Sequence, residues 1–233
     1  MQQQHITTAY DRELEAIQAQ IMRMGGLVEE AIRSSAQALD ELDLDLADKI
    51  VARDHSIDEL DEMINQEVAR LIALRAPTAV DLRLILTVMK VSGSLERIGD
   101  YAKNMAKRTH VLAGMSPMPA GSSSLRRMAR EVERMLNDAL DAYIQRDEDL
   151  ARDVIDRDRE VDQMYNALFR EFLTFMMEDP RNITGFMHMH FIAKNVERMG
   201  DHATSIAEWV IYLVSGERPD EARPKADVTS NMN

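Results

Sequence analysis

The string SLERIGDYAKN at residues 94–104 decides the fold, because a close copy of it, NVERMGDHATS, returns at residues 195–205. In both copies, two carboxylates stand four residues apart, one helical turn, with Arg and Gly between them. Like charges at this spacing repel each other on a helix by roughly 0.2–0.5 kcal/mol. A chain that repeats such an arrangement is expected to gain something from it, and a bound cation is the obvious candidate.

Apolar residues around both strings recur at alternating spacings of three and four, which is typical of the buried stripe of a helix. Leu95 and Ile98 in the first string correspond to Val196 and Met199 in the second, at a constant offset of 101 residues. Other stretches of the chain show the same period. The pattern predicts an all-α protein of six long helices, arranged as two tandem, pseudo-symmetric three-helix bundles.

The boundary between the two halves is marked by GMSPMPAGSSS at residues 114–124, which combines Gly, Pro and Ser without any period. Such a composition is typical of a linker. We therefore expect a first three-helix repeat at residues 8–113 and a second at 125–216. The tail at residues 217–233 is rich in charge and Pro and carries no apolar stripe, so we expect it to be disordered.

The composition excludes several classes of protein. Asp and Glu number 41 against 28 Lys and Arg, a net charge of -13, which disfavours binding to nucleic acid or to an anionic membrane. The chain has no Cys, so disulfides and thiolate sites are excluded. No run approaches the roughly 18 apolar residues of a membrane span, and the first residues lack a signal-peptide pattern. We expect a cytoplasmic protein without membrane insertion.

Each half supplies a second pair of acidic residues with the same spacing, on the helix before the repeated string. If these helices form antiparallel hairpins about Pro77 and about the Asp179–Pro180 turn, both pairs in a half lie at the same height. Their angles from the apolar stripes place them on an exterior groove and not in the core. The predicted metal ligands are Asp54, Asp58, Glu96 and Asp100 in the first half and Asp158, Asp162, Glu197 and Asp201 in the second.

Four carboxylates around one point raise each other's pKa unless a cation neutralises them. Oxygen ligands favour Mg, Mn, Fe or Ca, and Zn is a weaker candidate because the chain has no Cys. We expect one site per repeat, with one ion or several. Two alternatives remain open: Arg97 and Arg198 could neutralise the carboxylates in a metal-free structural bundle, or the carboxylates could serve a metal-dependent phosphoesterase or an iron-handling protein.

The histidines do not supply a di-iron site, because that site needs Glu-x-x-His on inward-facing helices. His188, His190 and His202 lack this spacing, so we interpret them as packing or surface residues.

The chain resembles the PhoU family. The resemblance rests on residues 77–108 and 193–216, which are similar to the two signature helices of that family, with the A-x-D-L-R start and the E-R-x-G-D string. It covers residues 10–216 and implies a fold of two three-helix bundles. It also implies metal clusters held by E(D)-x-x-x-D motifs, the same eight carboxylates. Ser205 stands where the first half has Asn104, so the second site is expected to bind more weakly or to hold a different number of ions.

The resemblance also implies a regulatory role. PhoU-like proteins act between the ATPase subunit of the phosphate ABC transporter and a sensor histidine kinase, and they keep the phosphate-starvation response off when phosphate is plentiful. The resemblance further implies a homodimer. The sequence has no P-loop, no dinucleotide loop and no G-x-S-x-G motif. We therefore expect a metal-binding adaptor that negatively regulates phosphate metabolism and modulates phosphate uptake, and not an enzyme.

Overall fold

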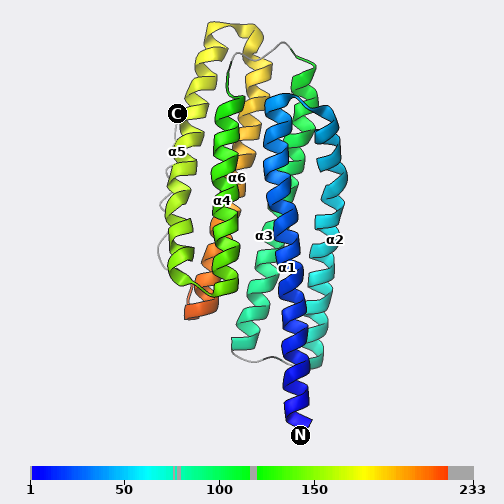
Figure 1. The fold of residues 1–233 in the computed structure, drawn as a ribbon. Helices are drawn as coiled ribbons and strands as arrows, with labels where there is room; N and C mark the ends of the chain where they lie inside the picture. Colours follow the sequence, from blue (N-terminus) through cyan, green and yellow to red (C-terminus); the bar gives the residue numbers. More distant parts are fainter. Residues whose placement is uncertain (1, 76, 78–79, 116–119, 220–233) are drawn as a thin grey trace.

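In the computed structural model, which describes residues 2–75, 77, 80–115 and 120–219, the chain forms six long α-helices and no strand (Figure 1). The prediction of an all-α protein with six helices is confirmed. The helices are α1 (Gln2–Glu41), α2 (Leu44–Arg75), α3 (Val80–Ala113), α4 (Ser122–Gln145), α5 (Glu148–Glu178) and α6 (Ile183–Ser215), with a short 3₁₀ turn, η1 (Pro180–Asn182), before α6.

Short loops with a capping aspartate join α1 to α2 and α4 to α5. Asp43 precedes α2, and its carboxylate accepts a hydrogen bond from the backbone N–H of Leu46 at 2.9 Å. Asp147 precedes α5 and accepts from the backbone N–H of Leu150 at 3.0 Å in the same way. Such caps satisfy donors that the first turn of a helix leaves open. Because these two loops are only two residues long, the helices that they join run antiparallel.

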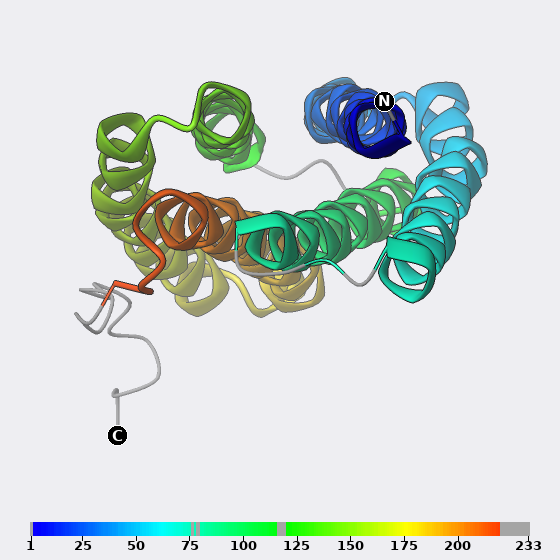
Figure 2. The ribbon, with the colours of Figure 1, turned by 90° about the horizontal axis from the view of Figure 1, so that it is seen from below.

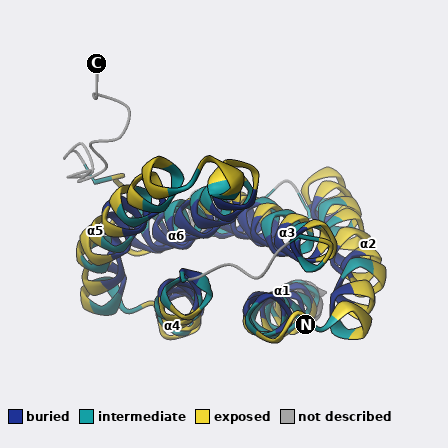
Figure 3. Cartoon of the chain, turned by 90° about the horizontal axis from the view of Figure 1, so that it is seen from above, coloured by how far each residue is buried: buried dark blue, intermediate teal, exposed yellow. Residues whose placement is uncertain are grey.

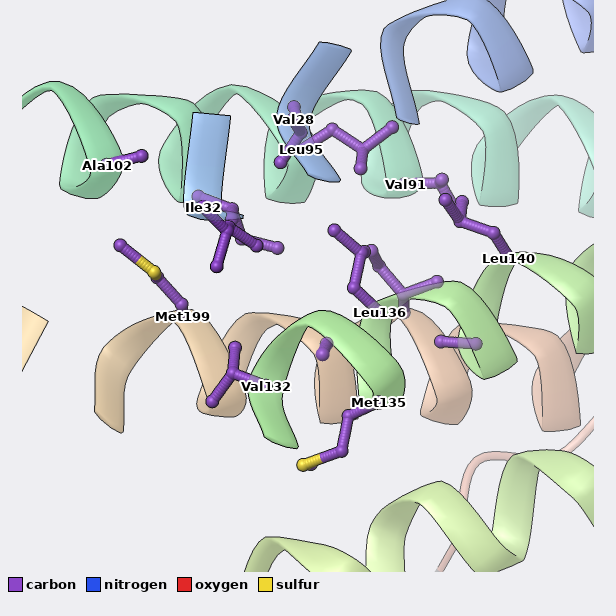
Figure 4. Packing of buried hydrophobic residues seen from close by; sticks show 14 of the residues in the cluster. Val28, Ile32, Val91, Leu95, Ala102, Val132, Met135, Leu136, Leu140 and Met199 are labelled. Atoms are coloured by element: carbon purple, nitrogen blue, oxygen red, sulfur yellow. The ribbon is translucent and has the colours of Figure 1, made fainter. Parts of the chain in front are cut away.

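Helices α3 and α6 lie side by side in the middle of one layer, with α2 and α5 at its two ends (Figures 2 and 3). Helices α1 and α4 form a second layer that faces α3 and α6. The two halves meet through α3 against α6 and through α1 against α4. Buried apolar residues from both halves form one continuous cluster. In Figure 4, Val28 and Ile32 of α1, Leu95 of α3, Leu136 of α4 and Met199 of α6 converge in it.

The pair α3 and α6 is antiparallel and pseudo-symmetric. Lys90 of α3 lies over the ring of Trp209 of α6 at 5.7 Å from its centroid. Arg108, further along α3, lies over the ring of Phe191, nearer the start of α6, at 4.6 Å. The repeat offset of 101 residues relates Lys90 to Phe191 and Arg108 to Trp209. Both contacts therefore join the same two positions of the repeat, and at each position one half has a cation and the other an aromatic ring. This arrangement confirms the predicted pseudo-symmetry of the halves.

Two sequence predictions fall partly outside the described residues. The predicted disordered tail includes residues 220–233, and the predicted linker includes residues 116–119, neither of which the structure describes. Helix α3 ends at Ala113, directly before that linker, whereas α4 begins at Ser122, inside the predicted linker of residues 114–124. Within the described part of the chain, no helix has the length and apolarity needed to cross a membrane.

Candidate metal centre

The paired helices approach each other closely at the glycines of the repeated strings. A Cβ added to Gly99 of α3 would lie 3.8 Å from Oδ1 of Asp54 on α2. A Cβ added to Gly200 of α6 would lie 3.5 Å from Oδ1 of Asp158 on α5. Both distances are ordinary van der Waals contacts, so each carboxylate lies against the facing helix at its glycine, and the tighter contact of Gly99 is with Cδ1 of Ile57, at 3.0 Å from the added Cβ. The predicted hairpin register is confirmed in both halves, with Asp54 and Asp158 at equivalent places.

The four predicted ligands of the first half lie within one electrostatic neighbourhood. Asp54 is buried, Glu96 and Asp100 are half-buried, and Asp58 is exposed. Burial raises the pKa of the Asp58 carboxyl, and the charges of Asp54 on its own helix and Asp100 on α3 raise it further. Burial likewise raises the pKa of Glu96, and Asp100 adds to the effect. The carboxylates of α2 and α3 thus repel one another across the seam.

A lysine that the sequence analysis did not single out lies between these carboxylates. The ammonium of Lys103 donates hydrogen bonds to Oδ2 of Asp54 and, at 2.6 Å, to Oδ1 of Asp100. Partial burial lowers the pKa of Lys103, but the hydrogen bonds to Asp100 and Asp54 outweigh it and raise the pKa above its usual range. Arg97, more exposed, lies 3.5 Å from Glu96 and 3.9 Å from Asp100. The first half therefore contains ion pairs of the kind expected for a metal-free bundle, but Lys103, and not Arg97, makes the closest contacts with the carboxylates.

A fifth carboxylate also belongs to this neighbourhood. Asp61 is half-buried on α2, and its charge contributes to the raised pKa of Glu96, after burial and Asp100. Asp61 and Lys103 were not predicted as part of the site, although their spacing in the sequence indicates it. Asp61 follows Asp58 by three residues, and Lys103 follows Asp100 by three. Side chains at this spacing share a helix face.

The second half presents its carboxylates in the same register but with a different lysine. Lys194 donates a hydrogen bond to Oε1 of Glu197 at 2.8 Å, and its ammonium lies 4.9 Å from the centroid of the Tyr165 ring. Asp201 is half-buried. The remaining ligands predicted on this side are buried, namely Asp158, Asp162 and Glu197.

The equivalent of Lys103 in the second half is Thr204, which is fully buried and donates its hydroxyl hydrogen bond to the carbonyl of Gly200 at 3.0 Å. Arg198, the equivalent of Arg97, lies over the ring of Tyr101 at 6.0 Å from its centroid. The two halves therefore repeat the carboxylates, while the lysine beside them stands at a different position in each half.

The prediction that the carboxylates lie on an exterior groove is wrong for half of them. Asp54 is 6% exposed and Glu197 is 4% exposed, and Asp158 and Asp162 are also buried. For Asp54 and Asp158 the physical reason is the close approach of the facing helix, which covers positions off the apolar stripe at Gly99 and Gly200. The candidate sites are seams between α2 and α3 and between α5 and α6.

The carboxylate oxygens have the chemistry that a hard cation prefers, but their arrangement in the structure is not that of a metal site. Across the described ranges, no group of three or more His, Asp or Glu side chains is arranged to hold a metal ion directly. Lys103, however, bridges carboxylates of α2 and α3, so the two helices present oxygens close enough to share one cation. Oxygen donors of this kind suit Mg and Mn. An ion held at this seam would have to share or replace the contacts that the Lys103 ammonium makes with Asp54 and Asp100.

Comparison with known proteins relates both halves to one domain family. The family model described as PhoU domain matches residues 21–109 and 125–210. A relative in Caulobacter vibrioides, named phosphate-specific transport system accessory protein PhoU homolog, is 46% identical over 227 residues, covering 97% of this chain and 99% of that protein. A relative of the same name in Rhizobium meliloti is 42% identical over 232 residues, covering 100% and 98%.

Two solved structures share the fold. The crystal structure of PhoU from Pseudomonas aeruginosa matches with a TM-score of 0.85 at 40% identity, covering 89% of this chain and 100% of that one. The phosphate transport system regulatory protein PhoU from Streptococcus pneumoniae matches with a TM-score of 0.84 at 29% identity, covering 91% and 100%. With the family domain in both halves and relatives similar over the full length, the chain belongs to the PhoU family.

Proposed function

We propose that this protein is an accessory regulator of a phosphate-specific transport system. The observation that carries the proposal is the occurrence of the PhoU domain in both halves, together with full-length relatives that are named as accessory proteins of that system. The repeated carboxylate register at Gly99 and Gly200 supports a shared role for the two domains. Within this proposal the protein acts through its surfaces and its bound ions, and not as an enzyme.

In its finer form, the protein is a cytoplasmic adaptor between the ATPase subunit of the phosphate ABC transporter and the sensor histidine kinase. It keeps the phosphate-starvation response off when phosphate is plentiful, and it restrains phosphate uptake. It works as a homodimer. Six long helices with exposed faces on both α3 and α6 offer extended contact surfaces for such partners.

The proposal includes divalent metal ions, Mg, Mn or Fe, at the two helix seams. The ligands would be Asp54, Asp58, Glu96 and Asp100 in the first half, and Asp158, Asp162, Glu197 and Asp201 in the second. A bound ion supplies positive charge that neutralises the crowded carboxylates and links the two helices of a hairpin. The protein's own groups fix the carboxylates by their helical register and by burial, which limits the access of water to Asp54 and Glu197.

A second candidate is an adaptor of the same family that binds no metal. The contacts of Lys103 with Asp54 and Asp100, and of Arg97 with Glu96, favour it, because they already neutralise part of the cluster. The two candidates differ in one measurable respect: added divalent ions raise the melting temperature in the first and leave it unchanged in the second.

The regulatory proposal is tested by deleting the gene and measuring a phosphate-starvation reporter such as alkaline phosphatase in phosphate-rich medium. The proposal expects the reporter to rise and the wild-type gene to restore repression. The variant Glu96→Gln/Asp100→Asn tests the metal requirement, and Glu62→Gln, an exposed change on α2, is the matched control that restores repression fully. A reporter that stays low after deletion contradicts the regulatory role.

The proposed assembly is tested separately. Purified ATPase subunit and the cytoplasmic part of the kinase are each mixed with the protein, and the complexes are measured by light scattering after gel filtration. The proposal expects a dimer of the protein alone and a larger complex with each partner. A monomer at micromolar concentration contradicts the homodimer, and two unbound partners contradict the adaptor role.

A further inference from the structure

Each carboxylate cluster carries a lysine ammonium, but at a different place in the repeat. In the first half it is Lys103, three residues after Asp100. In the second half it is Lys194, three residues before Glu197, and the first half has Gly93 at that place. The repeat therefore keeps the carboxylates and replaces the lysine.

Lys103 makes contacts of the kind that a bound ion would make. Its side chain is 19% exposed, and it reaches one carboxylate on each helix of the hairpin, Asp54 of α2 and Asp100 of α3. An ammonium is a compact point charge with three donors on a flexible stem, so it can bridge oxygens from two directions. The ammonium and a metal ion repel each other at this short range, so each weakens the binding of the other to the same two carboxylates.

The cation content of the first cluster leaves room for further positive charge. Asp54, Asp58, Glu96 and Asp100 carry four negative charges, and the cations within 4 Å of any of them are Lys103 and Arg97 among the described residues. Exchange of one ammonium for one divalent ion brings the cluster closer to neutrality and frees the lysine. A monovalent cation gains nothing by the same exchange.

We propose that Lys103 is a built-in counter-cation that competes with divalent ions for Asp54 and Asp100, so that ion binding to the first half requires the Lys103 ammonium to swing out towards solvent. The inference rests on the metal binding proposed above and assigns a regulating residue to it. Lys103 holds the α2–α3 seam together without metal and lowers the affinity of that seam for the ion.

The experiment uses the full chain with Glu197→Gln and Asp201→Asn, so that the first half alone is measured. Protein dialysed against chelator is titrated with Mn²⁺ by calorimetry, and Lys103→Met is compared with its parent. Met keeps the length and apolar stem and removes the charge. We expect affinity to rise by about tenfold, which corresponds to about 1.4 kcal/mol. Lys107→Met, an exposed lysine one turn further along α3, is the matched control and leaves the affinity unchanged.

Two further variants separate charge from shape. Lys103→Gln removes the charge with a polar side chain and serves if the Met variant does not fold, and it is expected to bind Mn²⁺ as Lys103→Met does. Lys103→Arg keeps a cation and is expected to bind as weakly as the parent. Without added metal, both neutral variants are expected to melt below the parent, and saturating Mn²⁺ is expected to raise their melting temperatures more than that of the parent.

The outcomes distinguish the inference from the function on which it rests. If the parent binds Mn²⁺ and the neutral variants bind with the same affinity, the inference is overturned while the metal-binding proposal stands. If neither the parent nor the chain with its second half intact binds any Mn²⁺, the metal part of the proposed function fails and the inference fails with it. Tighter binding by both neutral variants, with Lys103→Arg unchanged, supports it.

Discussion

The substitution Asp54→Asn tests whether the ion pair at the α2–α3 seam contributes to the stability of the fold. Asn keeps the shape of the side chain and removes its charge, so Lys103 loses one of its two carboxylate partners. The contact joins α2 to α3, and its two side chains are 7% and 19% exposed. In protein dialysed against chelator, we expect the variant to be less stable than wild type.

The magnitude follows from the burial of this pair. Breaking a fully buried ion pair by removing one partner costs about 3–5 kcal/mol, and an exposed pair is worth about 0.2–1 kcal/mol. Lys103 is partly exposed and keeps Asp100 at 2.6 Å. Loss of repulsion with Asp58 offsets a few tenths of a kcal/mol. We therefore expect a loss of about 1–2 kcal/mol, which for a chain of this size lowers the melting temperature by about 2–8 °C.

Thermal melts followed by circular dichroism measure the effect. Asp48→Asn is the control, because Asp48 pairs with His110 at the surface and is 71% exposed, and its change is expected to stay within about 0.5 kcal/mol. In a double-mutant cycle, Asp54→Asn combined with Lys103→Met is expected to cost less than the sum of the two single changes. A melting temperature of Asp54→Asn equal to or above that of wild type would show that this ion pair does not stabilise the fold.

Three further predictions concern the core and the contact between the halves. Burial raises the pKa of Glu29, so the stability that this group contributes is present below its unfolded pKa and is lost as pH rises through its folded pKa. Glu29→Gln should therefore raise the melting temperature at about pH 7, and this gain should shrink towards about pH 4. Gly121 has φ of 108°, and an added Cβ would lie 2.8 Å from Cε1 of Phe172, so Gly121→Ala should lower the unfolding free energy by about 1–3 kcal/mol in urea titrations, whereas an unchanged midpoint would contradict it. Leu136 is fully buried where the halves meet, so Leu136→Ala should cost about 2–5 kcal/mol and keep a single transition, and two separate transitions would argue against a shared core.

The hairpin register could be predicted from the sequence because few physical factors decide it. Apolar spacing assigns the helices, and a short turn forces neighbouring helices to run antiparallel, so counting from Pro77 places Asp54 near Gly99. The same counting from the Asp179–Pro180 turn places Asp158 near Gly200. The structure has both contacts.

The burial of the carboxylates could not be predicted in this way. The helical angle of a residue says how far it lies from its own apolar stripe, but a helix with several neighbours is covered on more than one side. Asp54, for example, is buried against α3, where it pairs with Lys103 and lies beside Gly99. The antiparallel packing of α3 on α6, which joins the halves into one core, likewise depends on contacts between residues far apart in the chain.

The role of Lys103 was missed for a related reason. A search for repeated residues finds the carboxylates, because both halves share them. It passes over Lys103, because the equivalent residue is Thr204 and the lysine of the second half stands at position 194. The spacing of Lys103 from Asp100 was visible in the sequence, but its contact with Asp54 on another helix was visible only in the structure.

A calorimetric titration of the chelator-dialysed full chain with Mn²⁺ measures directly whether the two helix seams hold divalent ions. We expect saturable binding at both seams, with the part due to the first seam abolished by Glu96→Gln/Asp100→Asn and the part due to the second seam retained. No saturable heat with Mn²⁺, and none with Mg²⁺ or Fe²⁺ under the same conditions, would contradict metal binding at the seams and leave the metal-free adaptor as the better description.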